Sequence, residues 1–113
     1  MIRMKDRRTE RRMMCADMVE VSWTERSGEP SCATALLEDI SSAGACLQLE
    51  SPVPLGVEIH WRAPGQEFRG TVRYCVYREI GYFVGVEFKA SSQWSKKTFE
   101  PRHLLDPESL VQK

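Results

Sequence analysis

The stretch Asp39-Ile40-Ser41-Ser42-Ala43-Gly44 is a D-x-S-x-x-G loop that lies between two strand-like runs. Residues 32–38 precede it, and Ala45, Leu47 and Leu49 alternate with other residues after it. A period of two is typical of a strand with one buried face. Asp and Ser hydrogen-bond the backbone in turns, and Gly tolerates positive φ. The stretch therefore predicts a tight connection between two β-strands.

The same period recurs on both sides of this loop, with Gly and Pro clusters between the runs. Strands are predicted at residues 19–24, 32–38, 45–49, 57–61, 68–74 (with an extension to 77) and 82–88. In the fifth run Phe68, Gly70, Val72 and Tyr74 alternate with polar residues, which places these four on one face. Six short strands with frequent turns predict a mainly β fold, a small six-stranded antiparallel barrel.

A short C-terminal helix is predicted after the last strand. Ser91 or Ser92 is a candidate N-cap, and Pro101 would end the helix. We expect Trp94 and Phe99 to cover one end of the sheet. The chain then divides into a basic N-terminal arm (1–12), a barrel (13–90), and a short helix with a tail (91–113).

The formal net charge of zero hides an asymmetry between the arm and the rest of the chain. Residues 1–12 contain six basic and two acidic residues, a net charge of +4, and the remainder carries ten basic and fourteen acidic residues, or −4. Such an arm is attracted to anions or to its own domain. Because the body has no clustered basic face, binding to a nucleic acid polymer is not expected.

Several other functions are disfavoured by the sequence. Its longest apolar runs are far below the roughly 20 residues that span a bilayer, and no signal peptide is evident, so a cytoplasmic protein without membrane insertion is expected. The four cysteines form no C-x-x-C pair and are interpreted as structural, with no metal site or cofactor expected. His60 and His103 have no evident catalytic partner, so no catalytic residue and no enzyme is predicted.

The arm contains the cluster Arg7-Arg8-Thr9-Glu10-Arg11-Arg12, which includes the spacing R-x-x-x-R. Taken alone, such a cluster is usually a solvated tail. A guanidinium group can nevertheless chelate a phosphate, bond guanine O6 and N7, or stack on a purine. Asp39 could accept hydrogen bonds from guanine N1–H and its exocyclic amine, Ser41 could add a hydroxyl, and Gly44 would let a ligand approach the backbone.

In this order along the chain, the two motifs resemble the PilZ domain, the bacterial receptor for cyclic di-GMP. The R-x-x-x-R of the family maps onto Arg8 and Arg12, with Arg7 as an additional arginine, although a register of Arg7 and Arg11 also fits. The D-x-S-x-x-G motif is present without substitution, and the resemblance covers roughly residues 7–90.

The resemblance implies a receptor or adaptor that binds cyclic di-GMP, as one molecule or as an intercalated dimer, and then regulates an unidentified downstream protein. The implied ligand-binding residues are Arg7, Arg8, Arg12, Asp39, Ser41 and Gly44. The residue near Tyr74 is in some family members an aromatic ligand contact, but a core or surface tyrosine fits the sequence equally well. The alternative is a protein–protein interaction module that has the PilZ fold and no ligand.

Overall fold

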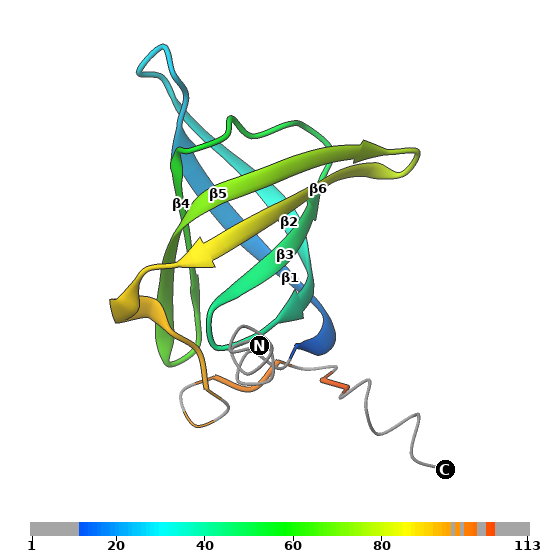
Figure 1. Cartoon of the computed structure of the whole chain (residues 1–113), viewed down its shortest axis with the longest axis vertical. Helices are drawn as coiled ribbons and strands as arrows, with labels where there is room; N and C mark the ends of the chain where they lie inside the picture. Colours follow the sequence, from blue (N-terminus) through cyan, green and yellow to red (C-terminus); the bar gives the residue numbers. More distant parts are fainter. Residues whose placement is uncertain (1–11, 96, 98, 102–103, 106–113) are drawn as a thin grey trace, which may run out of the picture.

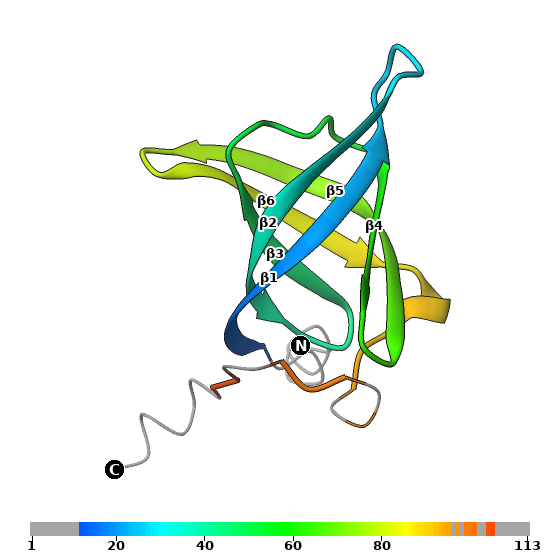
Figure 2. The same cartoon turned by 180° about the vertical axis from the view of Figure 1, so that it is seen from behind.

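The computed structural model describes residues 12–95, 97, 99–101 and 104–105. Six strands close into a barrel in the order β1-β2-β3-β6-β5-β4, and all six neighbouring pairs are antiparallel (Figures 1 and 2). The strands are β1 (Met13–Thr24), β2 (Pro30–Ile40), β3 (Gly44–Leu49), β4 (Glu58–Ala63), β5 (Gln66–Arg78) and β6 (Gly81–Phe88). The predicted fold class, a mainly β antiparallel barrel of six strands, is confirmed.

β1 begins at Met13, six residues before the first residue of clean alternation in the sequence. The cause is a bulge: the pairing of β1 with β2 shifts register between Met14 and Asp17. An extra residue on one strand changes which face the following side chains occupy, and this hides the period of two. β2 and β5 contain similar shifts, between Leu37 and Asp39 and between Val72 and Tyr74.

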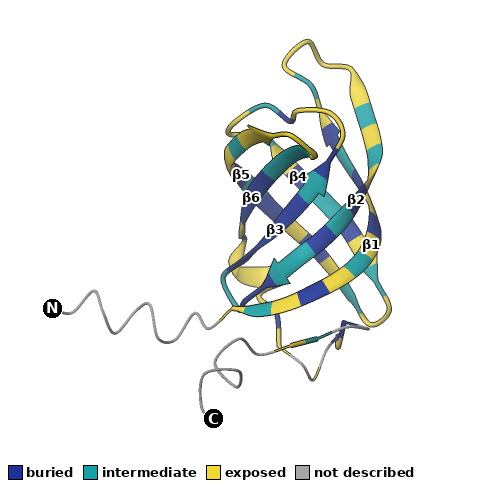
Figure 3. Ribbon diagram, turned by 90° about the vertical axis from the view of Figure 1, so that its right-hand side faces the viewer, coloured by how far each residue is buried: buried dark blue, intermediate teal, exposed yellow. Residues whose placement is uncertain are grey.

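The barrel interior is filled by the alternating apolar residues of all six strands, so buried and exposed positions alternate along the ribbons (Figure 3). One end is aromatic. The Phe68 ring lies 5.3 Å from the Trp61 ring and 5.2 Å from the Phe88 ring, and Phe99 meets it edge-on at 5.9 Å (centroid distances). Burial of such rings supplies much of the hydrophobic stabilisation in a small domain.

Among the described residues after β6, the structure has a single 3-10 turn, η1 (Ala90–Ser92), which ends before Trp94, and no α-helix. Ser92 does not cap a helix, because its buried hydroxyl accepts a hydrogen bond from the Arg69 amide at 2.9 Å and ties the turn to β5. Trp94 and Phe99 do cover an end of the barrel. Both are buried, and Trp94 Nε1 donates to the Phe99 carbonyl at 2.7 Å.

Beyond this cover, Leu105 pairs with Met14 through two backbone hydrogen bonds of 2.7 Å. On another side of the barrel, β5 and β6 continue as a hairpin that projects from the body (Figures 1 and 2). Within the described residues, no helix has the length and apolar character needed to cross a membrane.

Candidate functional site

The start of β1 and the end of β2 bring two of the predicted site residues together. Met14 pairs with Asp39, and the Arg12 side chain two residues earlier reaches the same carboxylate. Arg12 Nη1 donates to Asp39 Oδ1 at 2.5 Å, with 54% of the Arg12 side chain and 26% of the Asp39 side chain exposed. The basic and acidic motifs therefore meet in space, and Arg12 remains accessible to a ligand.

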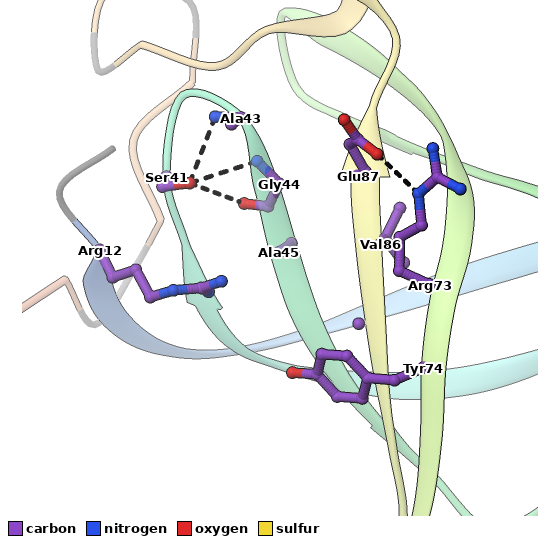
Figure 4. Close-up of a pocket in the computed structure, with 10 residues that line it drawn as sticks. Arg12, Ser41, Ala43, Gly44, Ala45, Arg73, Tyr74, Val86 and Glu87 are labelled. Carbon is purple, nitrogen blue, oxygen red and sulfur yellow. Dashed lines mark hydrogen bonds and ion pairs between the residues drawn. The ribbon is translucent and has the colours of Figure 1, made fainter. Parts of the chain in front are cut away.

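Ser41 shapes the loop between β2 and β3. Its backbone amide donates to the Gly44 carbonyl at 2.8 Å, and its hydroxyl oxygen accepts from the amides of Ala43 and Gly44 at 3.2 Å each (Figure 4). The side chain is buried. Because the hydroxyl is occupied by the loop itself, the geometry favours a positioning role for Ser41 over direct ligand contact.

Gly44 and Gly85 form the floor of the site beside this loop. At each of them a neighbouring strand or ring approaches the backbone very closely. A Cβ atom at Gly44 would lie 2.2 Å from the Val86 carbonyl oxygen, and one at Gly85 would lie 2.1 Å from Tyr74 Cε2. The Tyr74 ring thus covers Gly85 at van der Waals distance. Both positions require glycine because any side chain would collide with its neighbour.

A pocket of about 240 Å³ lies between these elements. Its lining residues are Arg12, Ser41, Ala43, Gly44, Ala45, Arg73, Tyr74, Gly85, Val86 and Glu87. In Figure 4 the Arg12 side chain extends from the residue just before β1, and the Tyr74 ring extends from β5. Both point toward β3, which lies between them. At the far rim Arg73 Nε donates to Glu87 Oε1 at 2.6 Å. The pocket offers charged groups at its edges and backbone at its floor.

Two bulges of the barrel, in β2 and β5, set the direction of side chains at or near this pocket. The bulge in β2 turns Asp39 outward although Leu37, two residues earlier, points into the core. In the same way the bulge in β5 turns Tyr74, which is 41% exposed, away from the buried Val72, so of the two settings that the sequence left open for Tyr74 the structure shows the surface one. Bulges often re-aim side chains next to functional sites. Here they present a carboxylate and a phenol on the outer surface.

Burial sets the electrostatics of the site. Partial burial raises the pKa of Asp39, while the charge and hydrogen bond of Arg12 act in the opposite direction. Burial and a hydrogen bond with Cys46 raise the pKa of Tyr74 to about 12, and burial also raises the pKa of the Cys46 thiol. At neutral pH the phenol and the thiol are therefore uncharged. Neither of these two groups is therefore an activated nucleophile.

Sequence reasoning missed Arg73, Gly85 and Glu87 as pocket residues. They reach the site through the β3–β6 and β5–β6 pairings, and neither long-range pairing leaves a local spacing signal. The only available signal was the glycine inside a strand run at position 85, which indicates close approach of another group. The predicted ligand residues Arg7 and Arg8 lie outside the described residues.

Other polar groups do not form a second reactive centre in the described part of the chain. His60 Nε2 and Nδ1 lie 2.9 and 3.5 Å from Ser22 Oγ, so the hydroxyl meets the edge of the ring, which is not the geometry of a general base. No cluster of three metal-ligating side chains occurs among the described residues. The cysteines are free thiols, and Cys32, interpreted as structural, is exposed on the outer face of β2.

The chain is thus a small closed β-barrel domain with an ion pair and a glycine-floored candidate pocket on its outer wall. The family model described as PilZ domain matches residues 6–100, and the chain belongs to this family. PilZ domains are binding and adaptor domains, and the family is known for binding cyclic di-GMP. The curated proteins compared with the chain include no match.

Proposed function

We propose that the chain is a cytoplasmic receptor for cyclic di-GMP, which binds in the pocket beside the Arg12–Asp39 ion pair and thereby changes how the domain acts on a downstream partner. The observation that carries this proposal is the ion pair itself. It joins Arg12 of the first family motif to Asp39 of the second, and Arg12, Ser41 and Gly44 line one pocket.

The charges present fit the chemistry of the ligand. Each phosphate of cyclic di-GMP carries one negative charge, and the planar guanidinium of Arg12 can bind it through two parallel hydrogen bonds. Asp39 accepts hydrogen bonds only, which suits the N1–H and amino donors on the edge of guanine. An exposed ion pair contributes only about 0–1 kcal/mol, so a phosphate can draw Arg12 away from Asp39 at little cost.

The floor of the pocket fits a flat ligand. Gly44 and Gly85 line the pocket without a side chain, and the flat Tyr74 ring covers Gly85. A planar base can approach such a surface more closely than one covered by aliphatic side chains. In this proposal Tyr74 borders the bound nucleotide, and Ser41 holds the loop in the shape that the nucleotide meets.

Isothermal titration with cyclic di-GMP tests the proposal, with GTP and cyclic di-AMP as ligand controls. Losing one charge-assisted contact typically costs about 1.5–3 kcal/mol, which is roughly a tenfold to hundredfold loss of affinity. Arg8→Ala, Arg12→Ala and Asp39→Asn should each weaken binding at least tenfold. Arg62→Ala, which removes an exposed arginine outside the pocket, should leave the affinity unchanged.

Wild-type affinity in Arg12→Ala would refute the proposed site. Absence of any cyclic di-GMP binding by the folded wild-type domain would refute the receptor function, and would favour the alternative of a ligand-free interaction module.

The proposal extends to stoichiometry and to the N-terminal arm. A stacked pair of ligands brings four phosphate charges, and Arg7 would supply a third guanidinium to offset their repulsion. Calorimetry should therefore give two ligands per chain for wild type, and a lower ratio for Arg7→Ala. A ratio of one for wild type would contradict the intercalated dimer.

Residues 1–12 are proposed to close over the ligand when Arg7, Arg8 and Arg12 gain a common anionic target. Amide relaxation measured by NMR should then change for residues 3–12 on binding. Identical relaxation in the free and bound states would exclude the arm as the switch.

A further inference from the structure

A row of mostly apolar side chains crosses the outside of the barrel next to the ligand pocket. Strand pairing places Met18 (β1) beside Leu36 (β2), Leu36 beside Gln48 (β3), Gln48 beside Phe83 (β6), and Phe83 beside Val76 (β5). Four of these residues have buried sequence neighbours, and Val76 is itself 41% exposed, so the five side chains face outward. The buried neighbours are Val19, Ala35, Leu37, Leu47, Leu49 and Val84. We call the five outward-facing residues the outer row.

The outer row is accessible to a partner. Met18 is 63% exposed and Val76 41%, and Leu36 and Phe83 are partly exposed. A groove of about 570 Å³ is lined by Met18, Leu36 and Gln48 of the row and by Ile80, which lies in the turn between β5 and β6. Ile80 is 69% exposed, and its carbonyl accepts a hydrogen bond from Gln48 Nε2 at 2.9 Å, which fixes the hairpin tip over the row.

Carboxylates surround the outer row. Glu20 and Glu38 lie two residues beyond Met18 and Leu36, Glu50 lines the groove, and Glu79 is exposed next to Ile80. The basic side chain at this surface, Arg78, lies over the Phe83 ring at 5.7 Å. An apolar strip with a predominantly acidic border is complementary to an apolar strip with a basic border.

We propose that the outer row is the docking site for an amphipathic helix of a partner protein, with an apolar stripe flanked by Lys and Arg. The part of the row that lines the groove spans β1, β2 and β3, two strand spacings of about 4.8 Å or about 10 Å in all, which matches about two turns of a helix. Amphipathic helices laid into apolar grooves are a recurrent recognition mode. A second copy of this chain fits less well, because its own acidic border would oppose this one.

The docking site is separate from the proposed cyclic di-GMP site but adjacent to it. Val76 is two residues from Tyr74 on β5, and Gln48 is two residues from Cys46, the hydrogen-bond partner of Tyr74. A helix on the outer row would therefore lie next to the pocket wall. The docking itself needs no nucleotide, so it can be tested on the free domain, independently of the receptor function.

The test uses the isolated domain, ¹⁵N-labelled, and a synthetic 14-residue amphipathic peptide of Leu and Lys, with a Leu and Glu peptide of the same pattern as control. The Leu/Lys peptide should shift the amide signals of the outer row and Ile80, and the Leu/Glu peptide should not bind. Met18→Asp and Ile80→Asp should weaken binding at least tenfold. Leu55→Asp, at an equally exposed apolar side chain (52%) outside the groove, is the matched control.

The charge border is tested separately. Glu50→Lys with Glu79→Lys should weaken binding of the Leu/Lys peptide about as much as the apolar changes do, because it removes two attractive contacts and adds two repulsive ones.

Three results would overturn the proposal. In the first, the Leu/Lys peptide shifts amide signals outside the outer row and Ile80, or Leu55→Asp weakens peptide binding as much as Ile80→Asp does. In the second, sedimentation shows a dimer of the free chain that Ile80→Asp dissociates, which would assign the row to a second copy. In the third, the domain binds anionic lipid vesicles and Met18→Asp abolishes that binding, which would assign the row to a membrane surface.

Discussion

At one end of the barrel Trp61, Phe68, Phe88 and Phe99 fill the interior with rings, whereas at the pocket Gly44 and Gly85 lie where a neighbouring strand or ring leaves no space for a side chain. β5 passes through both regions, with Phe68 in the first and Tyr74 in the second. The first region stabilises the fold by burial, and the second leaves room for a ligand at the cost of packing. Substitutions in the two regions should therefore have different consequences.

The largest loss of stability is expected at the aromatic end. Phe68→Ala removes a fully buried ring that contacts three others, and such changes typically cost about 3–5 kcal/mol. Denaturant unfolding followed by tryptophan fluorescence measures this loss. Leu55→Ala, at an exposed apolar side chain (52%) outside the barrel core, is the control and should change the free energy of unfolding by about 0.5 kcal/mol or less. A loss below about 1 kcal/mol for Phe68→Ala would show that the rings do not carry the stability.

An intermediate effect is expected at the two glycines of the pocket floor, which differ in what an added methyl group would strike. At Gly44 it meets the Val86 backbone oxygen, which is fixed in the β3–β6 pairing, so Gly44→Ala should cost about 1–3 kcal/mol. At Gly85 it meets only the Tyr74 ring, which can rotate away. Gly85→Ala should therefore cost less, as measured by the same unfolding experiment.

A double-mutant cycle sharpens this distinction. Tyr74→Ala should largely rescue the loss caused by Gly85→Ala, because it removes the colliding ring, and should leave the loss caused by Gly44→Ala unchanged. Equal rescue at both glycines would mean that Tyr74 does not cover Gly85 specifically.

The regular parts of the barrel were predictable from the sequence because each buried strand face leaves a period of two. Prediction failed where a bulge shifts that period, at the start of β1 and at Tyr74. It also failed after β6, where the candidate cap Ser92 bonds β5 and leaves a single 3-10 turn. A local pattern does not reveal a hydrogen bond to a strand more than twenty residues away.

The candidate site was predictable to the extent that it lies in contiguous motifs. Asp39 and Arg12 were identified in this way, and the structure places them in contact. Arg73 and Glu87 were not, because only the closure of the barrel brings them to the pocket. The sequence also did not show that Ser41 is buried. A serine in this motif can support its own loop or contact a ligand, and only the hydrogen bonds of its hydroxyl distinguish the two roles.

The smallest effect concerns the ion pair at the pocket edge. Burial raises the pKa of Asp39 and Arg12 lowers it, so Arg12→Ala should raise the pKa of Asp39 further. A carboxyl whose pKa is higher in the folded than in the unfolded state favours folding on acidification. Its contribution grows as the pH falls through the folded-state pKa and is complete below the ordinary value of 3.8. The gain in stability on acidification from neutral pH should therefore be larger in Arg12→Ala than in wild type.

Titration of the Asp39 carboxyl carbon by NMR measures the pKa directly, with Arg73→Ala as the control because its partner is Glu87. An unchanged Asp39 pKa in Arg12→Ala would mean that the ion pair does not form in solution, and that Arg12 is already free to meet a ligand.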